Sequence, residues 1–322
     1  MKDKVELLVI STNIFSVSEE DERIIEEAVP QVALTVVRGE EVTPELIGKA
    51  QIIFGWLTKE QIGQAKCLKW LHLPSAGADD YTTISDYCNN DIRVTTSSGV
   101  FGMPIAEHIF AMILAYNHNL QEYAYKKAEK KWHRNWNTKD FFGSTIGILG
   151  LGDIGTEVAK RAKVWGATVI AVKRRQSEKP EYIDRLYSME ELDEVLKQSD
   201  YLVLALPNTP KTRNIINEEK LRLMKPEAFL VNIGRGALVD QEALIRALSE
   251  GWIGGAGLDV TEPEPLPEDS PLWELKNVLL TPHASGTSPT NGVRRREIFL
   301  KNLKNYLEGR PLINQVDFKE EY

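Results

Sequence analysis

Six residues near the middle of the chain, Gly150-Leu151-Gly152-Asp153-Ile154-Gly155, have the glycine spacing of a loop that binds dinucleotide phosphates. The apolar run 146–149 before them indicates a strand, and the segment 157–164 after them is typical of a helix. The first glycine allows a tight turn, the second lets the backbone approach a pyrophosphate, and the third lets helix and strand pack closely. The start of the helix then offers N–H groups to the phosphates. The predicted dinucleotide site includes Gly150, Gly152, Asp153, Ile154 and Gly155.

The next predicted strand, residues 168–172, is followed by Lys173-Arg174-Arg175. An acidic residue at about this position would bind the ribose 2′-hydroxyl of NAD. Guanidinium groups instead bind a phosphate through bidentate, charge-assisted hydrogen bonds. The sequence therefore predicts NADP(H) as the preferred cofactor, with NAD(H) possible; a solvated basic loop is the alternative interpretation.

Three later segments place an arginine, a glutamate and a histidine shortly after predicted strands. They are Asn232-Ile233-Gly234-Arg235-Gly236, the proline-rich stretch 262–267 that contains Glu264, and Thr281-Pro282-His283-Ala284-Ser285-Gly286. Ligands of open α/β sheets bind outside the carboxyl ends of the strands. Taken singly, Arg235 would be solvated, Glu264 would lie on the surface, and His283 would make a turn or packing contact. Their joint occurrence after a dinucleotide loop favours a catalytic set.

Together with the glycine loop, these segments resemble the D-isomer-specific 2-hydroxyacid dehydrogenase family, in particular its glyoxylate/hydroxypyruvate reductase-like branch. The resemblance covers nearly the whole chain. Ser75-Ala76-Gly77 resembles the family's substrate-carboxylate loop, and the stretch from Ser98-Gly99-Val100 to Ala106-Glu107-His108 resembles the segment that leads into its long helix. The resemblance implies an oxidoreductase that transfers a hydride between a nicotinamide cofactor and a small 2-keto or D-2-hydroxy acid.

The expected reaction explains the residue types of the catalytic set. Reduction of a 2-keto acid places negative charge on the carbonyl oxygen, so the site needs a proton donor and a fixed positive charge. His283 would donate the proton in reduction and accept it in oxidation, because imidazole titrates nearest to physiological pH. Glu264 would hold the second ring nitrogen of His283, and Arg235 would bind the carboxylate and keto oxygen of the substrate. Ser75-Ala76-Gly77 would bind the same carboxylate, with backbone N–H groups of Ala76 and Gly77.

The resemblance also adds residues to the expected cofactor site. Asp259 resembles the family residue that meets the nicotinamide carboxamide, although a turn or helix-cap role is the alternative. Pro207 and Thr212 resemble the lip of the cofactor cleft, and a plain turn is the alternative there. The remaining members of this expected site are Ile233, His283 and Gly286.

Composition restricts the class of protein. The chain has 322 residues, of which 42% are hydrophobic, and this length suits two domains. The net charge is −8, which disfavours nucleic-acid and membrane-surface partners. Cys67 and Cys88 have neither metal-ligand spacing nor the density of a disulfide framework, so we expect no metal and a reducing cytoplasm. The first ten residues are charged at four positions, and their apolar run is too short for a signal peptide or a membrane span.

The hydrophobic pattern predicts the elements that position these residues. In the first hundred residues, short apolar runs alternate with segments of helical composition, as in βαβ units. The expected strands there are 7–10, 32–37, 52–54, 70–73 and 92–95. A long helix is predicted from 104 to 131, and strands are then expected at 145–149, 168–172, 201–206, 229–232, 255–259 and 278–280. The last helix, 294–307, is not followed by a predicted strand, so we expect it to return to the first domain.

The predicted fold class is therefore α/β with two doubly wound domains. A Rossmann-type dinucleotide-binding domain, residues 101–287, is expected to be inserted into a flavodoxin-like substrate-binding domain made of residues 1–100 and 288–322. The apolar surface of the helix 104–131 predicts a homodimer. Trp132 and Trp136 are predicted mainly as core aromatic residues, with a contact to the partner subunit as the alternative.

A different class of function stays open at this point. A dinucleotide-sensing binding protein, such as a co-repressor built on the same fold, would bind the cofactor and catalyse little. Such proteins are expected to carry extended disordered flanking segments, and this sequence has almost none. The enzyme is therefore the favoured interpretation.

Overall fold

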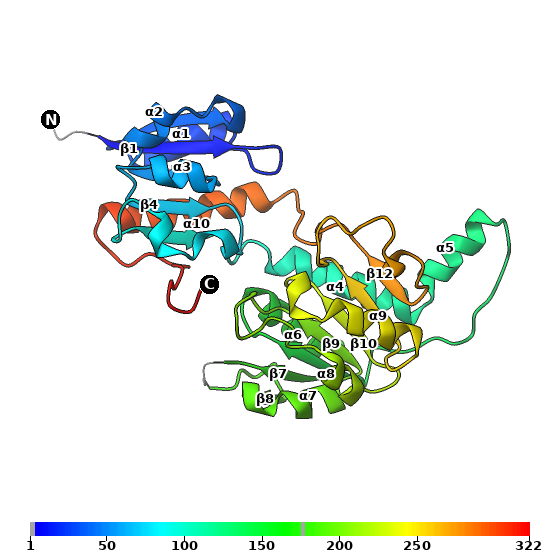
Figure 1. Cartoon of the computed structure of the whole chain (residues 1–322). Coiled ribbons are helices and arrows are strands. Elements are labelled where there is room, and N and C mark those ends of the chain that lie inside the picture. The colour runs from blue at the N-terminus through cyan, green and yellow to red at the C-terminus, as the bar shows by residue number, and fades with distance from the viewer. Residues whose placement is uncertain (1–3, 175–177) are drawn as a thin grey trace. The chain divides into compact units, whose positions relative to one another are not determined.

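The computed structural model describes residues 4–174 and 178–322. The described parts of 1–100 and 288–322 form one compact unit, and the described parts of 101–287 form the other. Both are α/β, as the sequence predicts (Figure 1). Across the described ranges, every helix is too short or too polar to span a bilayer.

The first unit is built around a five-stranded parallel sheet. Its strands lie in the order β2-β1-β3-β4-β5, which is the flavodoxin-like order expected for this part of the chain. Each predicted strand is present within two residues of its expected ends. The elements are β1 (Val5–Ser11), α1 (Glu19–Ala28), β2 (Val32–Arg38), α2 (Pro44–Lys49), β3 (Ile52–Phe54), α3 (Lys59–Gln64), β4 (Trp70–Leu73), β5 (Arg93–Thr96) and α10 (Asn291–Leu307).

Two hydrophobic clusters cover the two faces of this sheet. Leu7 and Val9 of β1 pack with α1 and α10, whereas their neighbours Leu8 and Ile10 pack with α2 and α3. Successive side chains of a strand point to opposite faces, so a strand buried on both sides must be apolar throughout. This explains why the strand segments of the first unit appear in the sequence as short continuous apolar runs.

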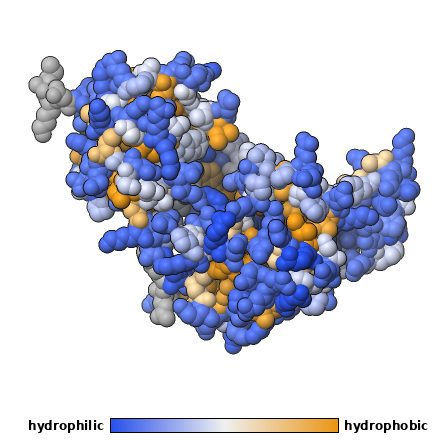
Figure 2. Space-filling model, in the orientation of Figure 1, coloured by the Kyte–Doolittle hydropathy of each residue, from blue (hydrophilic) through white to orange (hydrophobic). Residues whose placement is uncertain are grey.

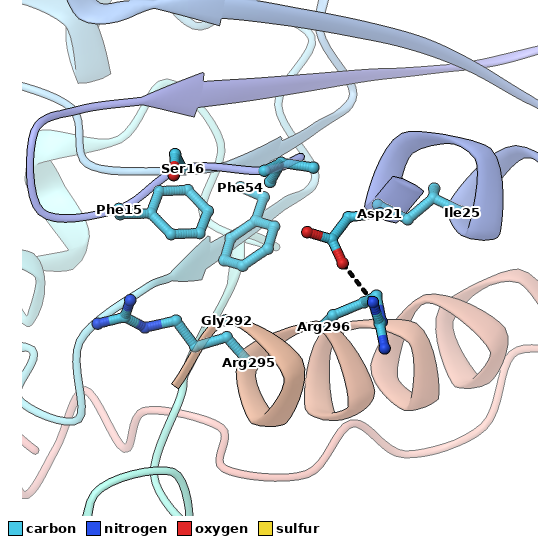
Figure 3. A pocket seen from close by; sticks show the side chains of 9 residues that line it. Phe15, Ser16, Asp21, Ile25, Phe54, Gly292, Arg295 and Arg296 are labelled. Carbon is cyan, nitrogen blue, oxygen red and sulfur yellow. Dashed lines mark hydrogen bonds and ion pairs between the residues drawn. The ribbon is translucent and has the colours of Figure 1, made fainter. Parts of the chain in front are cut away.

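A small hollow in the first unit lies between α1, α10 and the segment after β1 (Figure 3). The Asp21 carboxylate forms an ion pair there with the Arg296 guanidinium. Burial alone would raise the pKa of Asp21, but hydrogen bonds from Ser18 and Arg296 outweigh it and lower that pKa. The protein's own ion pair therefore occupies this hollow, and none of the candidate catalytic residues lines it.

The second unit is built around a seven-stranded parallel sheet in the order β12-β11-β10-β9-β6-β7-β8. This is the Rossmann order with one additional strand. The six predicted strands are present, and β8 was not predicted. The elements are α4 (Gly102–Asn117), α5 (Leu120–Ala128), β6 (Thr145–Leu149), α6 (Asp153–Val164), β7 (Thr168–Val172), β8 (Arg185–Tyr187), α7 (Leu192–Gln198), β9 (Tyr201–Leu204), α8 (Glu218–Leu223), β10 (Phe229–Asn232), α9 (Gln241–Ser249), β11 (Gly255–Leu258) and β12 (Val278–Leu280).

Helices cover both faces of the second sheet. A large cluster joins one face to α7, α8 and α9, through buried residues such as Val195, Leu221 and Leu244. On the other face, α4 contacts β10, β11 and α6. Because every pairing in this sheet is parallel, the carboxyl ends of the strands lie at one edge, where the segments carrying the candidate residues begin.

The single helix predicted from 104 to 131 is wrong. The structure has two helices, because α4 ends at Asn117 and α5 begins at Leu120. Asn119 between them has a φ of 53°, a left-handed conformation that interrupts a helix and that Asn adopts more readily than most residues. In contrast to α4, α5 has no buried residue.

The prediction of core positions for the two tryptophans after α5 is also wrong. Trp132 is 95% exposed and Trp136 is 81% exposed. Arg134 places its guanidinium 5.6 Å from the centre of the Trp136 ring. Apolar character in the sequence predicts a core position, whereas these rings lie on the surface of the chain.

Candidate active site

The glycine loop connects β6 to α6 with the geometry that each glycine suggests. Gly150 has a φ of 100°, and a Cβ added there would lie 2.5 Å from the Ala205 carbonyl oxygen. A Cβ on Gly155 would lie 2.0 Å from the Gly150 carbonyl oxygen, so this glycine lets the helix pack against the loop. A Cβ on Gly152 would meet no atom within 4 Å. The middle glycine thus borders open space, as needed for close approach of a pyrophosphate, and the loop fits a dinucleotide.

Asp153 begins α6, and its side chain acts within the protein. Its carboxylate accepts a hydrogen bond of 2.8 Å from the backbone N–H of Gly102, the first residue of α4. A carboxylate at a helix N-terminus also interacts favourably with the helix dipole. Asp153 therefore ties the start of α4 to the start of α6, a contact that the sequence did not reveal. Ile154 follows it in the first turn of α6.

The basic segment lies beside the first glycine. The Gly150 N–H donates to the Val172 carbonyl oxygen at 3.1 Å, which joins the loop to the end of β7. Lys173 is partly buried and Arg174 is exposed, while Arg175 lies outside the described residues. A cofactor bound along the glycine loop would therefore extend toward Lys173 and Arg174.

The loop after β9 is closed by one hydroxyl group. Thr212 Oγ1 donates to the Pro207 carbonyl oxygen at 2.6 Å and accepts from the Thr209 N–H at 2.9 Å. Thr212 is buried, so it shapes this loop from the inside. Pro207 and Thr212 thus belong to one compact turn.

Arg235 follows β10 in a segment held by side-chain hydrogen bonds. Asn232 Nδ2 donates to the Arg235 carbonyl oxygen at 2.8 Å, and Asn232 Oδ1 accepts from the Gly234 N–H at 3.1 Å. Ile233 is buried. A Cβ on Gly236 would lie 2.0 Å from the Thr261 carbonyl oxygen, so glycine permits this segment to pack against the one that leads to Glu264. The two segments are therefore adjacent.

His283 and Glu264 form a hydrogen-bonded pair. Nδ1 of His283 lies 2.9 Å from Oε2 of Glu264, and Oε1 of the same carboxylate accepts from the Thr261 N–H at 3.1 Å. An ionised carboxylate only accepts hydrogen bonds, so Nδ1 carries the hydrogen in this pair. The His283 side chain is 52% exposed. The pair leaves Nε2 as the nitrogen that can exchange a proton with a bound molecule.

Asp259 follows β11 directly and is buried. Its carboxylate accepts from Thr281 Oγ1 at 2.6 Å, from the Ala284 N–H at 2.9 Å and from the Ser285 N–H at 3.0 Å. Burial alone would raise the pKa of Asp259, but the hydrogen bonds from Ser285, Thr281 and Ala284 outweigh it and lower that pKa. Asp259 is therefore a buried carboxylate that orders the segment around His283. Gly286, one residue further, packs against Phe101.

Comparison with known proteins decides the family. A family model described as D-isomer specific 2-hydroxyacid dehydrogenase, NAD binding domain, matches residues 110–285. A glyoxylate reductase of Korarchaeum cryptofilum is 38% identical over 250 residues, which cover 73% of this chain and 73% of that protein. This chain belongs to the D-isomer specific 2-hydroxyacid dehydrogenase family. It is accordingly an NAD(P)-dependent oxidoreductase that acts on the CH–OH group of 2-hydroxy acids, and the resemblance seen in the sequence is confirmed.

Solved structures of this dehydrogenase family match the chain over almost its whole length. A family protein from Aeromonas salmonicida has a TM-score of 0.85 and 31% identity, with 98% of this chain and 100% of that chain covered. A D-isomer specific 2-hydroxyacid dehydrogenase from Xanthobacter autotrophicus, in complex with NADPH and MES, has a TM-score of 0.83 and 28% identity, with 98% and 99% covered. The predicted fold class is confirmed.

The remaining predicted residues of this dehydrogenase, Ser75-Ala76-Gly77, follow β4 in the first unit. Ser75 Oγ accepts from Trp56 Nε1 at 3.2 Å and donates to the Gly77 carbonyl oxygen at 2.8 Å. The Ser97 N–H donates to the Ser75 carbonyl oxygen at 2.8 Å. These bonds hold the loop in one conformation within its own unit. In the other unit, hydrogen bonds connect His283 with Glu264 and with Asp259, and the segment of Arg235 packs against Thr261.

Proposed function

We propose that this protein is an NADP-preferring, cytoplasmic reductase that interconverts small 2-keto acids and D-2-hydroxy acids, with glyoxylate, hydroxypyruvate or a broad range of 2-keto acids as substrates. The observation that carries this proposal is the 2.9 Å hydrogen bond between His283 and Glu264. The segment of Arg235 packs against Thr261, in the segment that leads to Glu264. A histidine oriented by a carboxylate is the arrangement that proton-coupled reduction needs. The exposed, unpaired thiols of Cys67 and Cys88 suit a reducing compartment.

The residues of the site divide the chemistry between them. A nicotinamide cofactor would supply the hydride for the keto carbon when bound. Arg235 binds the substrate carboxylate and the keto oxygen, and its positive charge stabilises the negative charge that develops on that oxygen. His283 donates its proton from Nε2 to the same oxygen, while Glu264 holds Nδ1 and keeps the ring in orientation. Oxidation follows the reverse path, with His283 as the proton acceptor.

The remaining candidate residues bind the two ligands in this proposal. Ala76 and Gly77 offer backbone N–H groups to the substrate carboxylate, in the loop that Ser75 shapes. Gly150, Gly152, Ile154 and Gly155 hold the pyrophosphate at the start of α6, and Asp153 supports that helix start. The cofactor site is completed by Pro207, Thr212, Ile233, Asp259 and Gly286.

Lys173 and Arg174 support the preference for NADP. Both follow β7, whose last residue accepts a hydrogen bond from Gly150 of the phosphate loop. A 2′-phosphate placed there would meet positive charge in place of the acidic residue that binds the 2′-hydroxyl of NAD. The related Xanthobacter autotrophicus structure, at 28% identity, is in complex with NADPH.

One assay tests the substrate class and the cofactor together. Oxidation of NADPH is followed with glyoxylate, hydroxypyruvate, pyruvate and bulkier 2-keto acids, and each reaction is repeated with NADH at equal concentration. We expect turnover with at least one small keto acid, faster with NADPH. An Arg174→Glu variant should lower the ratio of kcat/KM for NADPH to that for NADH about tenfold or more, because it replaces attraction of the phosphate by repulsion.

Each result of this assay has a definite consequence. Faster turnover with NADH would refute the NADP preference but would still support the proposed reductase activity. Absence of turnover with every keto acid, in a protein that still binds NADPH, would favour the dinucleotide-sensing alternative.

The surface of the segment from α5 to Trp136 supports a homodimer. Leu120 and Tyr125 of α5 are exposed, as are Trp132 and Trp136 after it. Most of the face drawn in Figure 2 is hydrophilic, with hydrophobic residues in separate patches. Large exposed side chains with apolar bodies, gathered in one segment, commonly mark an interaction surface. We assign a second copy of this chain as the partner that covers this segment. The Trp rings then reach the other subunit.

Sedimentation equilibrium at micromolar concentration tests the dimer. The expected mass is twice the 36.4 kDa of one chain. A Trp132→Ser, Trp136→Ser double variant should dissociate more readily, because burial of each large aromatic side chain contributes on the order of 1.5–3 kcal/mol. A monomer for the wild-type protein would contradict this assignment.

A further inference from the structure

In the second unit, α4 packs along β11, so that residues on one face of the helix meet alternate residues of the strand. A Cβ added to Gly255 would lie 2.8 Å from the Tyr116 ring, and one added to Gly257 would lie 2.8 Å from Met112 Sδ. The two glycines therefore let the helix pack very close to the strand. Two residues of a strand advance about 6.6 Å and four residues of a helix about 6 Å, so the pairing continues along both elements.

The next pair in this series is His108 and Asp259. Nε2 of His108 lies 3.9 Å from Oδ1 of Asp259. Thr281, at the end of β12, bridges the two residues: its Oγ1 lies 3.0 Å from His108 Nε2 and 2.6 Å from Asp259 Oδ1. A polar chain of His108, Thr281 and Asp259 thus leads from the helix to the loop that carries the candidate proton donor.

The direction of each hydrogen bond in this chain is fixed. The Asp259 carboxylate only accepts, because its hydrogen bonds lower its pKa. The single hydrogen of the Thr281 hydroxyl is used toward Asp259, so that oxygen can only accept from His108. His108 must therefore carry a hydrogen on Nε2.

Asp259, at the other end of this polar chain, holds the backbone conformation of His283. The His283 N–H donates to the Asp259 carbonyl oxygen at 2.8 Å, and the next two N–H groups, of Ala284 and Ser285, donate to the Asp259 carboxylate. His283 itself has a φ of 50°, a left-handed conformation that is uncommon for a residue with a side chain. Surrounding contacts must hold such a conformation, and here Asp259 provides them.

We propose that His108 and Thr281 are positioning residues of the reaction, which hold the Asp259 carboxylate in the orientation on which the His283 backbone is built. This inference rests on the proposed role of His283 as proton donor. His108 reaches neither Nε2 of His283 nor Glu264 in this arrangement; it acts through Thr281 and Asp259. Its loss misplaces the proton donor while the glycine loop stays as it is.

Two matched pairs of variants test the proposal by kinetics. His108→Leu removes the donor and His108→Gln keeps an N–H group at similar reach; Thr281→Val removes the hydroxyl and Thr281→Ser keeps it. We expect the Leu and Val variants to lower kcat for keto acid reduction about tenfold, the effect of losing one hydrogen bond to a charged network. The Gln and Ser variants should recover most of kcat. The dissociation constant of NADPH should change less than twofold, and His118→Leu, at the exposed end of α4, serves as the control.

The tautomer of His108 gives a readout that does not depend on activity. In the ¹⁵N spectrum of ring-labelled histidines, the signal lost in His108→Gln should belong to a ring that carries its hydrogen on Nε2. A hydrogen on Nδ1 alone would overturn the proposal, as would equal losses of kcat in the Leu and Gln variants or none in either. A wild-type protein that reduces no keto acid would refute the proposed function, and the spectrum would still decide whether the hydrogen-bonded chain exists.

Discussion

The His283→Ala variant is expected to lose at least ~100-fold in kcat for keto acid reduction, since proton transfer by a positioned side chain typically contributes 10²–10⁴-fold. The residue meets the geometric requirement, because Nδ1 is held by Glu264 at 2.9 Å and leaves Nε2 for the substrate. The dissociation constant of NADPH should stay within about threefold of the wild-type value, since the phosphate loop is a separate segment of the same unit. Steady-state kinetics and fluorescence titration with NADPH provide the two measurements.

A second substitution at the same position separates chemistry from backbone conformation. Asn adopts left-handed backbone more readily than Ala, so His283→Asn suits the φ of 50° at this position. It keeps a side-chain N–H near Glu264 but has no group that titrates near neutral pH. Both variants should therefore lose kcat to a similar extent. If NADPH affinity falls as much as kcat in both, His283 is a structural residue and the proposed role is refuted.

Strands that are buried on both faces were predicted well from the sequence. Strands buried on both faces, such as β6 and β10, are short apolar runs, and their positions were predicted to within a residue or two. In contrast, β8 has the sequence Arg-Leu-Tyr with an exposed end, and it is a strand only because it pairs with β7. Pairing partners far along the chain cannot be read from a local pattern. The break between α4 and α5 was missed because the helical spacing resumes beyond Asn119.

The candidate site shows the same division. Residue types next to strand ends predicted Arg235, Glu264 and His283 as a catalytic set, because few side chains can transfer a proton or stabilise a negative charge. The contacts of Asp153 with Gly102 and of His108 with Thr281 join residues 51 and 173 positions apart, so no spacing rule could suggest them. Trp132 and Trp136, which are exposed, illustrate a further limit. In a sequence, an apolar residue of an interface cannot be distinguished from an apolar residue of the core.

His72 provides a second large effect, in the first unit. It is fully buried on β4, directly before the Ser75 loop, with Nδ1 2.6 Å from Thr95 Oγ1 and Nε2 3.3 Å from Ser97 Oγ. Trp70 Nε1 donates to Thr95 Oγ1 at 2.8 Å, which leaves the hydrogen of the Thr95 hydroxyl for Nδ1 of a neutral His72 ring. Ser97 Oγ donates to the Leu73 carbonyl oxygen at 2.9 Å, so Nε2–H of His72 donates to Ser97. With Nε2–H as the donor and Nδ1 as the acceptor, these contacts suit the neutral ring that burial favours.

Stability should therefore fall in mild acid by an amount that His72 controls. Burial lowers the pKa of His72 from 6.5 to about 3. At a pH between these two pKa values, His72 is protonated in the unfolded chain and neutral in the folded chain. The free energy of unfolding therefore decreases as the pH falls below 6.5. From pH 7 to pH 4.5 the loss from this one group is about 2–3 kcal/mol. His72→Gln keeps a donor and an acceptor without titrating, and its unfolding free energy in urea should decrease by that much less over the same range. His118→Gln, at an exposed position, controls for removal of an imidazole. Parallel pH profiles for wild type and His72→Gln would show that the folded protein accommodates a charged ring at this position.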